Sequence, residues 1–80
     1  MKLPRSVSGP DMVSALTRLG YEVTRQTGSH IRLTLKKHKQ HHITIPNHNP
    51  IKVGTLAAIV SDLSSQLDCP RNEIIFKLFG

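Results

Sequence analysis

The stretch "YEVTRQTGSHIRLTL", residues 21–35, decides the fold because apolar and polar residues alternate on both sides of a short turn. In its first part, residues 21–26, Tyr21 and Val23 alternate with polar neighbours, which is typical of a strand that buries one face. We expect the odd positions of this strand to face a layer of helices. "TGS", residues 27–29, has the composition of a turn, so a second strand should follow at once.

The second strand, "HIRLTL" at residues 30–35, continues the alternation, and "HITIP" at residues 42–46 predicts a third. Pro46 has no N–H to donate to a sheet and should end that strand. The loop between them, "KKHKQH" at residues 36–41, is expected to be solvated. The side chains expected to face the core are Ile31, Leu33, Leu35, Ile43 and Ile45. Those expected on the opposite, polar face are His30, Arg32, Thr34, His42 and Thr44.

A helix is predicted before the strands, in "SGPDMVSALTRLGY" at residues 8–21. Ser8 lies three residues before Asp11, which is the spacing of a capping box, and the carboxylate suits the positive end of a helix dipole. Gly20 can take the positive φ that often ends a helix. The apolar positions at helical spacing are Met12, Val13, Leu16 and Leu19.

Two more helices are predicted after the strands, in "GTLAAIVSDLSSQL" at residues 54–67 and "RNEIIFKLF" at residues 71–79. The first of these should begin near Gly54 or Thr55. Their apolar positions are Leu56, Ile59, Val60, Leu63 and Leu67, then Ile74, Ile75, Leu78 and Phe79. The sequence therefore predicts one α+β domain over residues 1–80, a two-layer sandwich with helices on one face of a three-stranded antiparallel sheet and the other face open.

Composition limits the partners of this fold. Eleven Lys and Arg against five Asp and Glu give a formal charge of +6, which favours RNA, DNA or an acidic protein as partner. The one cysteine cannot form an internal disulfide or a thiolate zinc site, which fits a reducing compartment. No apolar run is long enough to span a bilayer, and the first residues lack the apolar stretch of a signal peptide. We expect a cytoplasmic protein without membrane contact.

Three short motifs follow a leading helix that ends in "LGYEV": "GSH" at residues 28–30, "TIPNH" at 44–48 and "GTL" at 54–56. In this order and spacing they resemble the HicA (YcfA-like) toxins of HicAB toxin-antitoxin systems. The resemblance implies a double-stranded-RNA-binding-domain-like fold and an mRNA interferase, an endoribonuclease that cleaves mRNA. It also implies a HicB-like antitoxin that neutralises the toxin, allows a higher-order complex of the two, and makes His30 the catalytic residue.

The chemistry of His30 agrees with that role. An imidazole, with an ordinary pKa near ~6.5, can take a proton from a 2′-hydroxyl or give one to a leaving oxygen without a metal. Without the family resemblance, His30 is better explained as a turn residue that begins a strand. With it, we predict a catalytic His30 and no metal or other cofactor.

Residues near His30 are expected to bind RNA phosphates. Gly28 and Ser29 would let a phosphate approach backbone N–H groups. Arg25, Arg32 and Lys36 would hold the anion and stabilise charge on the phosphoryl oxygens. A plain solvated surface explains Arg32 and the following loop equally well, and Gly28 is better explained as a turn residue than as a ligand.

Other functions are weighed against cleavage. A non-catalytic module that binds double-stranded RNA through 2′-hydroxyls and phosphates is the main alternative. Base stacking on the sheet fits poorly, because the one Tyr and two Phe all lie at expected core positions. A purely structural partner of an acidic protein would use the same basic face.

A metal site built from histidines is a further alternative, and we expect it to be absent. Adjacent His41 and His42 should project to opposite faces of a strand, and no carboxylate lies nearby in the sequence. The imidazoles of this set are expected to be solvated loop side chains: His38, His41, His42 and His48.

Overall fold

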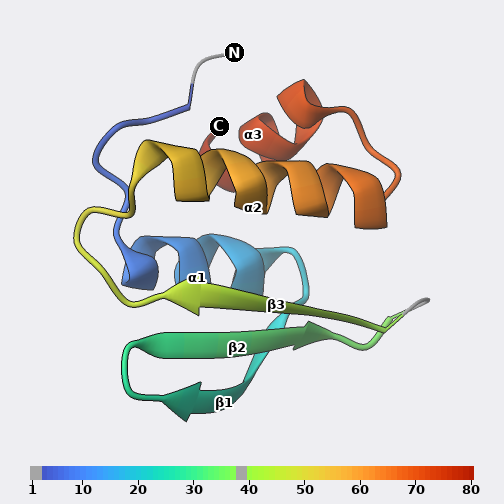
Figure 1. Cartoon of the computed structure of the whole chain (residues 1–80). Coiled ribbons are helices and arrows are strands. Elements are labelled where there is room, and N and C mark those ends of the chain that lie inside the picture. Colours follow the sequence, from blue (N-terminus) through green and yellow to red (C-terminus); the bar gives the residue numbers. More distant parts are fainter. Residues whose placement is uncertain (1–2, 38–39) are drawn as a thin grey trace.

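The computed structural model describes residues 3–37 and 40–80. The three strands form one antiparallel sheet in the order β1-β2-β3, so β2 is central. Figure 1 shows the three helices on one side of this sheet. The elements in chain order are α1 (Gly9–Arg18), β1 (Glu22–Thr27), β2 (His30–Leu35), β3 (His41–Pro46), α2 (Val53–Gln66) and α3 (Arg71–Phe79). The predicted α+β class and the predicted order of elements are confirmed.

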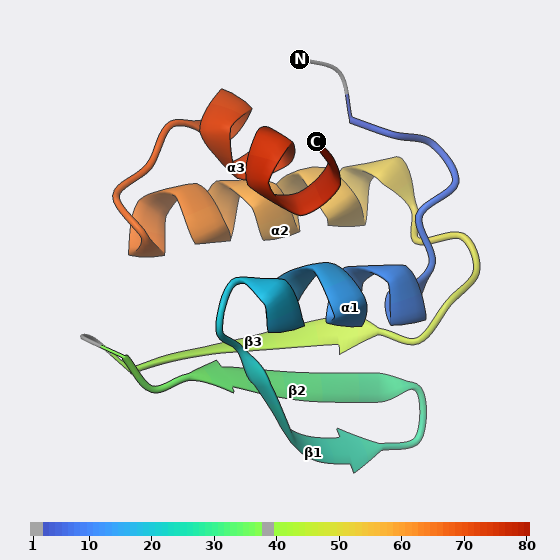
Figure 2. The same cartoon turned by 180° about the vertical axis from the view of Figure 1, so that it is seen from behind.

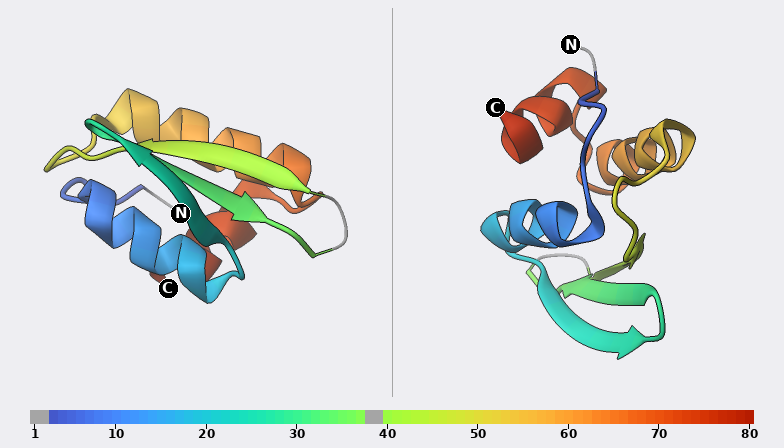
Figure 3. Two further views of the ribbon diagram at one scale, coloured as in Figure 1. Left: turned by 90° about the horizontal axis from the view of Figure 1, so that it is seen from below. Right: turned by 90° about the vertical axis from the view of Figure 1, so that its left-hand side faces the viewer.

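The helices are stacked above the sheet. α1 lies against β1 and β3, α2 lies farther from the strands, and α3 packs against both α1 and α2 (Figure 3, right). The view from behind shows the same stacking of α3, α2, α1 and sheet (Figure 2). The view from below looks onto the strands with α2 and α3 behind them (Figure 3, left). The sheet therefore has a covered face and an open face, as predicted.

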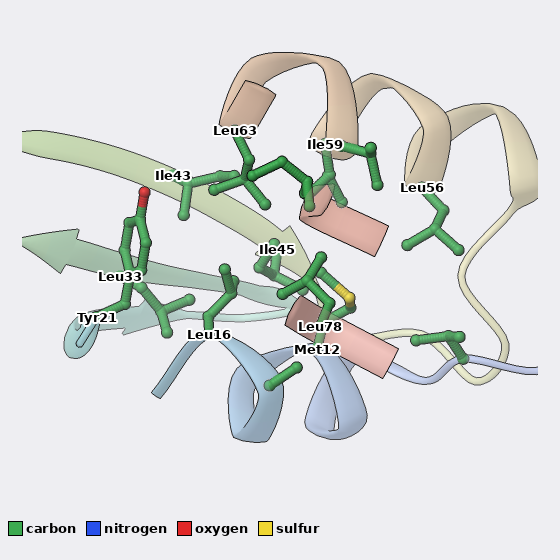
Figure 4. Packing of buried hydrophobic residues seen from close by; sticks show 14 of the residues in the cluster. Met12, Leu16, Tyr21, Leu33, Ile43, Ile45, Leu56, Ile59, Leu63 and Leu78 are labelled. Atoms are coloured by element: carbon green, nitrogen blue, oxygen red, sulfur yellow. The ribbon is translucent and has the colours of Figure 1, made fainter. Parts of the chain in front are cut away.

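The core fills the space between the covered face and the helices. Figure 4 shows side chains from α1, the three-stranded sheet, α2 and α3 meeting in one cluster. The members with 2% exposure or less include Met12, Leu16, Leu33, Ile45, Leu56, Leu63, Ile74 and Leu78. The apolar spacing of each predicted helix and of the second and third strands therefore identified the core, with Val13, Leu19, Leu67 and Phe79 at its partly buried margin.

The predicted capping box starts α1. The Asp11 N–H donates to Ser8 Oγ at 3.1 Å, and the Ser8 N–H donates to the Asp11 carboxylate at 3.1 Å. These bonds, the one from the Ser8 backbone first, hold the pKa of Asp11 below its usual value. Gly20 has a φ of +104°, as the end of the helix requires. α2 begins at Val53, slightly before its predicted start near Gly54 or Thr55.

The prediction that odd positions of the first strand face the helices is wrong after Val23. Val23 pairs with Leu33, but Arg25 pairs with Arg32, so Thr24 is an extra residue and forms a β-bulge. The bulge reverses the alternation and turns Arg25 to the open face. Val23 lies on the covered side but is 50% exposed, because β1 is an edge strand that the helices do not cover fully.

Two further predictions of burial are corrected. Phe76 is 61% exposed on α3 instead of lying in the core, since Ile74, Ile75 and Leu78 already provide the buried side of that short helix. Phe76 is on the level of helices farthest from the sheet, so it gives the open face no stacking platform. His41 is 8% exposed because it begins β3 on the covered side, whereas it was expected in a solvated loop.

None of the described helices is long and apolar enough to cross a membrane.

Candidate functional site

The open face is organised in rows by the strand register. Residues directly opposite each other in paired strands share a face, so the pairings place Thr27, His30 and Pro46 in one row. Arg25, Arg32 and Thr44 form the next row, and Glu22, Thr34 and His42 form the third. Successive rows are about 7 Å apart, because two residues separate them along β2 and β3.

His30 lies at the first residue of the central strand and its side chain is exposed. Its position between Thr27 of β1 and Pro46 of β3 fixes the backbone on both sides. Arg32, two residues along the same strand, is on the same face at about 7 Å between Cα atoms. An imidazole held by a rigid strand and open to solvent can meet a polymer that lies across the sheet.

The turn before His30 is held by the chain after β3. The Asn47 N–H donates to the Ser29 carbonyl at 2.6 Å, which ties the β1–β2 turn to the end of the third strand. Gly28 has a φ of +54°, which confirms its use as a turn residue. A Cβ at Gly28 would meet no atom within 4 Å, so the backbone here is open to solvent. A phosphate would therefore have room to approach the backbone of Gly28 and Ser29, as the expected role requires.

The bulge at Thr24 places two arginines opposite each other. Arg25 and Arg32 are direct cross-strand partners, and like charges in such positions are destabilising. Bulges are frequent next to functional sites, where they redirect a side chain. An anion between the two guanidinium groups would remove the repulsion, so this pair favours a negatively charged ligand.

A polar groove of about 310 Å³ runs over this part of the open face. Its lining residues are Thr24, Arg25, Arg32, Thr34, Lys36, Gln40 and His42. The structure thus brings together the three cations that the sequence singled out, although Lys36 also lies 3.9 Å from the Glu22 carboxylate in an exposed ion pair. His30, Gly28 and Ser29 lie outside the groove, at the turn end of the sheet.

Four groove residues were not among the predicted RNA-binding residues: Thr24, Thr34, Gln40 and His42. The alternation of β3 did place His42 on the polar face, which is confirmed. Thr34 lies on the expected face but is 2% exposed, because Thr24 and His42 contact its hydroxyl. Thr24 reaches the groove only through the bulge, for which the sequence carried no recognised signal.

The neighbouring His41 belongs to a buried network on the other face. Tyr21 Oη lies 2.7 Å from His41 Nδ1, and His41 Nε2 lies 3.3 Å from the Asp62 carboxylate. Burial, with a smaller contribution from the Asp62 charge, raises the pKa of Tyr21 to about 12. This network joins the start of β1, β3 and α2. Its place in the core makes it structural.

The expected projection of His41 and His42 to opposite faces is confirmed. Over residues 3–37 and 40–80, no three His, Cys, Asp or Glu side chains lie close enough to hold a metal ion. His38, the first member of the set considered, lies outside the described residues. His48 is exposed in the loop after β3.

A larger hollow, of about 480 Å³, lies at the end of the molecule where α1, α2 and β2 finish. It is lined partly by apolar side chains, and the one thiol among its lining residues is Cys69. The Cys69 thiol donates to the Glu73 carboxylate at 2.8 Å, and this bond is the main reason that its pKa is raised. A thiol kept protonated is a poor nucleophile, so size alone does not make this hollow the reactive site.

Comparison with known proteins gives the family. Residues 9–64 match the family described as "HicA toxin of bacterial toxin-antitoxin", a span that runs from the start of α1 nearly to the end of α2. No curated protein and no solved structure matches the chain.

The match covers well over half of the 80 residues and includes the whole sheet, so the chain belongs to the HicA toxin family. It is a toxin of a toxin-antitoxin system, as the motifs around "GSH" and "TIPNH" indicated. The observed α+β arrangement is consistent with the double-stranded-RNA-binding-domain-like fold expected from that resemblance.

Proposed function

We infer that this toxin is an endoribonuclease that cleaves mRNA on the open face of its sheet, with His30 as the catalytic residue. The observation that carries this proposal is the exposed imidazole of His30 at the start of the central strand, on the same face as Arg32 and the cationic groove. Family membership supports the class of toxin, and the open face supports the chemistry, since its exposed imidazole is two residues from Arg32 on the same strand.

The proposed reaction needs only groups that this face can offer. The RNA 2′-hydroxyl oxygen attacks the adjacent phosphorus, the P–O5′ bond breaks, and the products are a 2′,3′-cyclic phosphate and a 5′-hydroxyl. His30 takes the 2′-hydroxyl proton or gives a proton to the leaving oxygen, and water exchanges the other proton. Arg32, one row from His30, and its cross-strand partner Arg25 stabilise the negative charge that builds on the phosphoryl oxygens, and backbone N–H groups near Gly28 and Ser29 assist. Lys36, farther along the strand, holds the RNA backbone. Because an imidazole moves the proton, we expect cleavage to persist in chelator.

The test replaces His30 by Ala or Gln. Expression of either variant should no longer arrest growth or degrade RNA, and cleavage by the purified protein should fall by about 10²–10⁴-fold. His48→Ala, a change at an exposed loop histidine, is the matched control and should leave both readouts unchanged. A folded His30→Ala protein that still cuts RNA would remove His30 from the mechanism. Tight RNA binding by a wild-type chain that never cuts would favour the non-catalytic RNA-binding module.

The proposed partner is a HicB-like antitoxin that covers the same face. The covered side of the sheet is committed to the helices, so the basic open face is the surface on which an acidic partner and RNA would compete. An ordinary interface takes about 800 Å² from each partner, which is about a sixth of the 5106 Å² surface of this chain. A partner of that size on the open face would cover His30.

Competition measures this directly. Antitoxin titrated into a complex of His30→Ala toxin and labelled RNA should release the RNA. A stable ternary complex that still protects the RNA would show that inhibition acts through another surface.

A further inference from the structure

Three side chains on the open face form a hydrogen-bonded relay that the proposed cleavage does not use. Thr24 Oγ1 lies 2.9 Å from Thr34 Oγ1, and Thr34 Oγ1 lies 2.8 Å from His42 Nδ1. The Thr24 hydroxyl is also 3.4 Å from the Arg32 carbonyl oxygen, to which it can donate. Thr34 is buried and His42 is exposed, so a fixed hydroxyl positions a ring whose other edge meets solvent.

The relay can run in either direction. In one direction, Thr24 donates to Thr34 and Thr34 donates to His42 Nδ1, which leaves the proton of the neutral ring on Nε2. In the other, His42 Nδ1–H donates to Thr34, Thr34 donates to Thr24 and Thr24 donates to the Arg32 carbonyl. The second direction gives a protonated ring a complete set of acceptors. His42 Nε2–H is available as a donor on the solvent side in the first direction, and in the second only when the ring carries both protons.

The surroundings of that donor favour an anion with several oxygens. Arg25, Arg32 and Lys36 line the same groove as His42. Glu22, in the same row as His42, does not line the groove but lies 3.9 Å from Lys36, so the two arginines are the main attraction for an anion. The facing pair Arg25 and Arg32 already favours a negatively charged ligand. A phosphate group matches this set, since guanidinium groups bind its oxygens in pairs.

The distance between His30 and His42 decides whether the two side chains can contact the same phosphate. His42 pairs with Thr34, which lies four residues along β2 from His30. Four residues of strand span about 13 Å, so His30 and His42 do not reach the same phosphoryl group. The ligand of His42 is therefore separate from the bond that His30 acts on.

We propose that the groove at His42 is a second phosphate subsite. It binds a phosphodiester of the same RNA strand beyond the scissile one, and His42 Nε2–H is one of its donors. This rests on the proposed function, in that the polyanion is the RNA substrate. The strand then crosses the open face from the Gly28–Ser29 turn toward Lys36. RNA that is too short to reach the groove loses this contact.

The test separates binding from cleavage. Single-stranded RNA of about twelve nucleotides is titrated into the full-length His30→Ala protein and into His30→Ala combined with His42→Ala, with fluorescence anisotropy as the readout. The His42 change should weaken binding by about 5–10-fold, the effect of losing one hydrogen bond to a charged group. The matched control combines His30→Ala with His48→Ala and should bind as His30→Ala does. Thr34 keeps its bond to Thr24 in the variant, so the sheet should remain folded.

Cleavage gives the second readout. With His30 intact, His42→Ala should raise KM for the long RNA and leave kcat unchanged, and it should not change cleavage of an RNA trimmed to the nucleotides around the cut. Equal binding of long RNA with and without His42 overturns the subsite, as does an effect on antitoxin binding alone. RNA binding that depends on His42 in a chain that never cleaves would uphold the subsite and contradict the nuclease.

Discussion

The two faces of the sheet differ most clearly at the adjacent residues His41 and His42. His41 lies against the helices, where Tyr21 and Asp62 contact both of its ring nitrogens, and it holds three elements together. His42 lies on the open face, where Thr34 contacts one ring nitrogen and the side chain lines the cationic groove. The comparison teaches that residue type does not assign a role in this chain. The face does, because one face is filled by core and the other is free for a ligand.

The largest expected difference between the faces is in stability, at neighbouring positions of β3. Ile45 is fully buried and Thr44 is exposed. Ile45→Ala should lower the free energy of unfolding by about 2–5 kcal/mol, since it removes buried methyl groups and leaves a cavity. Thr44→Ala should cost less than about 1 kcal/mol. Urea unfolding of both variants checks this, and equal costs would mean that the open face is also packed.

Substitutions of His41 and His42 should show a smaller difference in the free energy of unfolding. His41→Ala leaves the buried Tyr21 hydroxyl without its partner and should cost about 1–3 kcal/mol of unfolding free energy. His42→Ala should stay within about 0.5 kcal/mol, because Thr34 keeps its contact with Thr24. Thermal unfolding of the two single variants compares them directly. A more destabilising change at His42 would contradict the division of roles between the faces.

The smallest expected effect concerns the Tyr21 hydroxyl and depends on pH. Tyr21→Phe should cost about 1 kcal/mol at neutral pH, the net value of one hydrogen bond. Burial raises the folded-state pKa of Tyr21 to about 12, so the neutral phenol favours the folded state. The unfolded chain releases this proton near pH 10, so wild-type stability is lost as the pH rises from 10 toward 12. Denaturant titrations should show the gap between wild type and Tyr21→Phe narrowing over that range, and a gap that widens would contradict the assignment.

Much of the fold could be predicted from the sequence because the decisive signals are local. The Ser8–Asp11 spacing, the positive φ of Gly20 and the alternation of residues 30–35 each act within a few residues. The bulge at Thr24 could not be predicted, since it depends on how β1 pairs with β2 along the edge of the sheet. The buried place of His41 escaped for a similar reason, because its partners are 20 and 21 residues away in the chain.

The candidate site divides in the same way. His30, Gly28 and Ser29 were identified from one short motif, and Arg32 from the alternation of its own strand. That Arg25 faces Arg32 depends on the bulge, and the groove at His42 depends on three strands meeting in register. Sequence pattern gives the face of a regular strand. It does not give the one irregular residue that brings the cations together.

The central claim is that the open face binds RNA. The most direct measurement is an NMR titration of isotope-labelled, full-length His30→Ala protein with a short single-stranded RNA. We predict amide shifts that follow the open face, at Arg25, Arg32, Thr34 and Thr44, with little change at Phe76 on α3. Shifts that concentrate on α3 or around the hollow at Cys69, with the open face unchanged, would contradict the account.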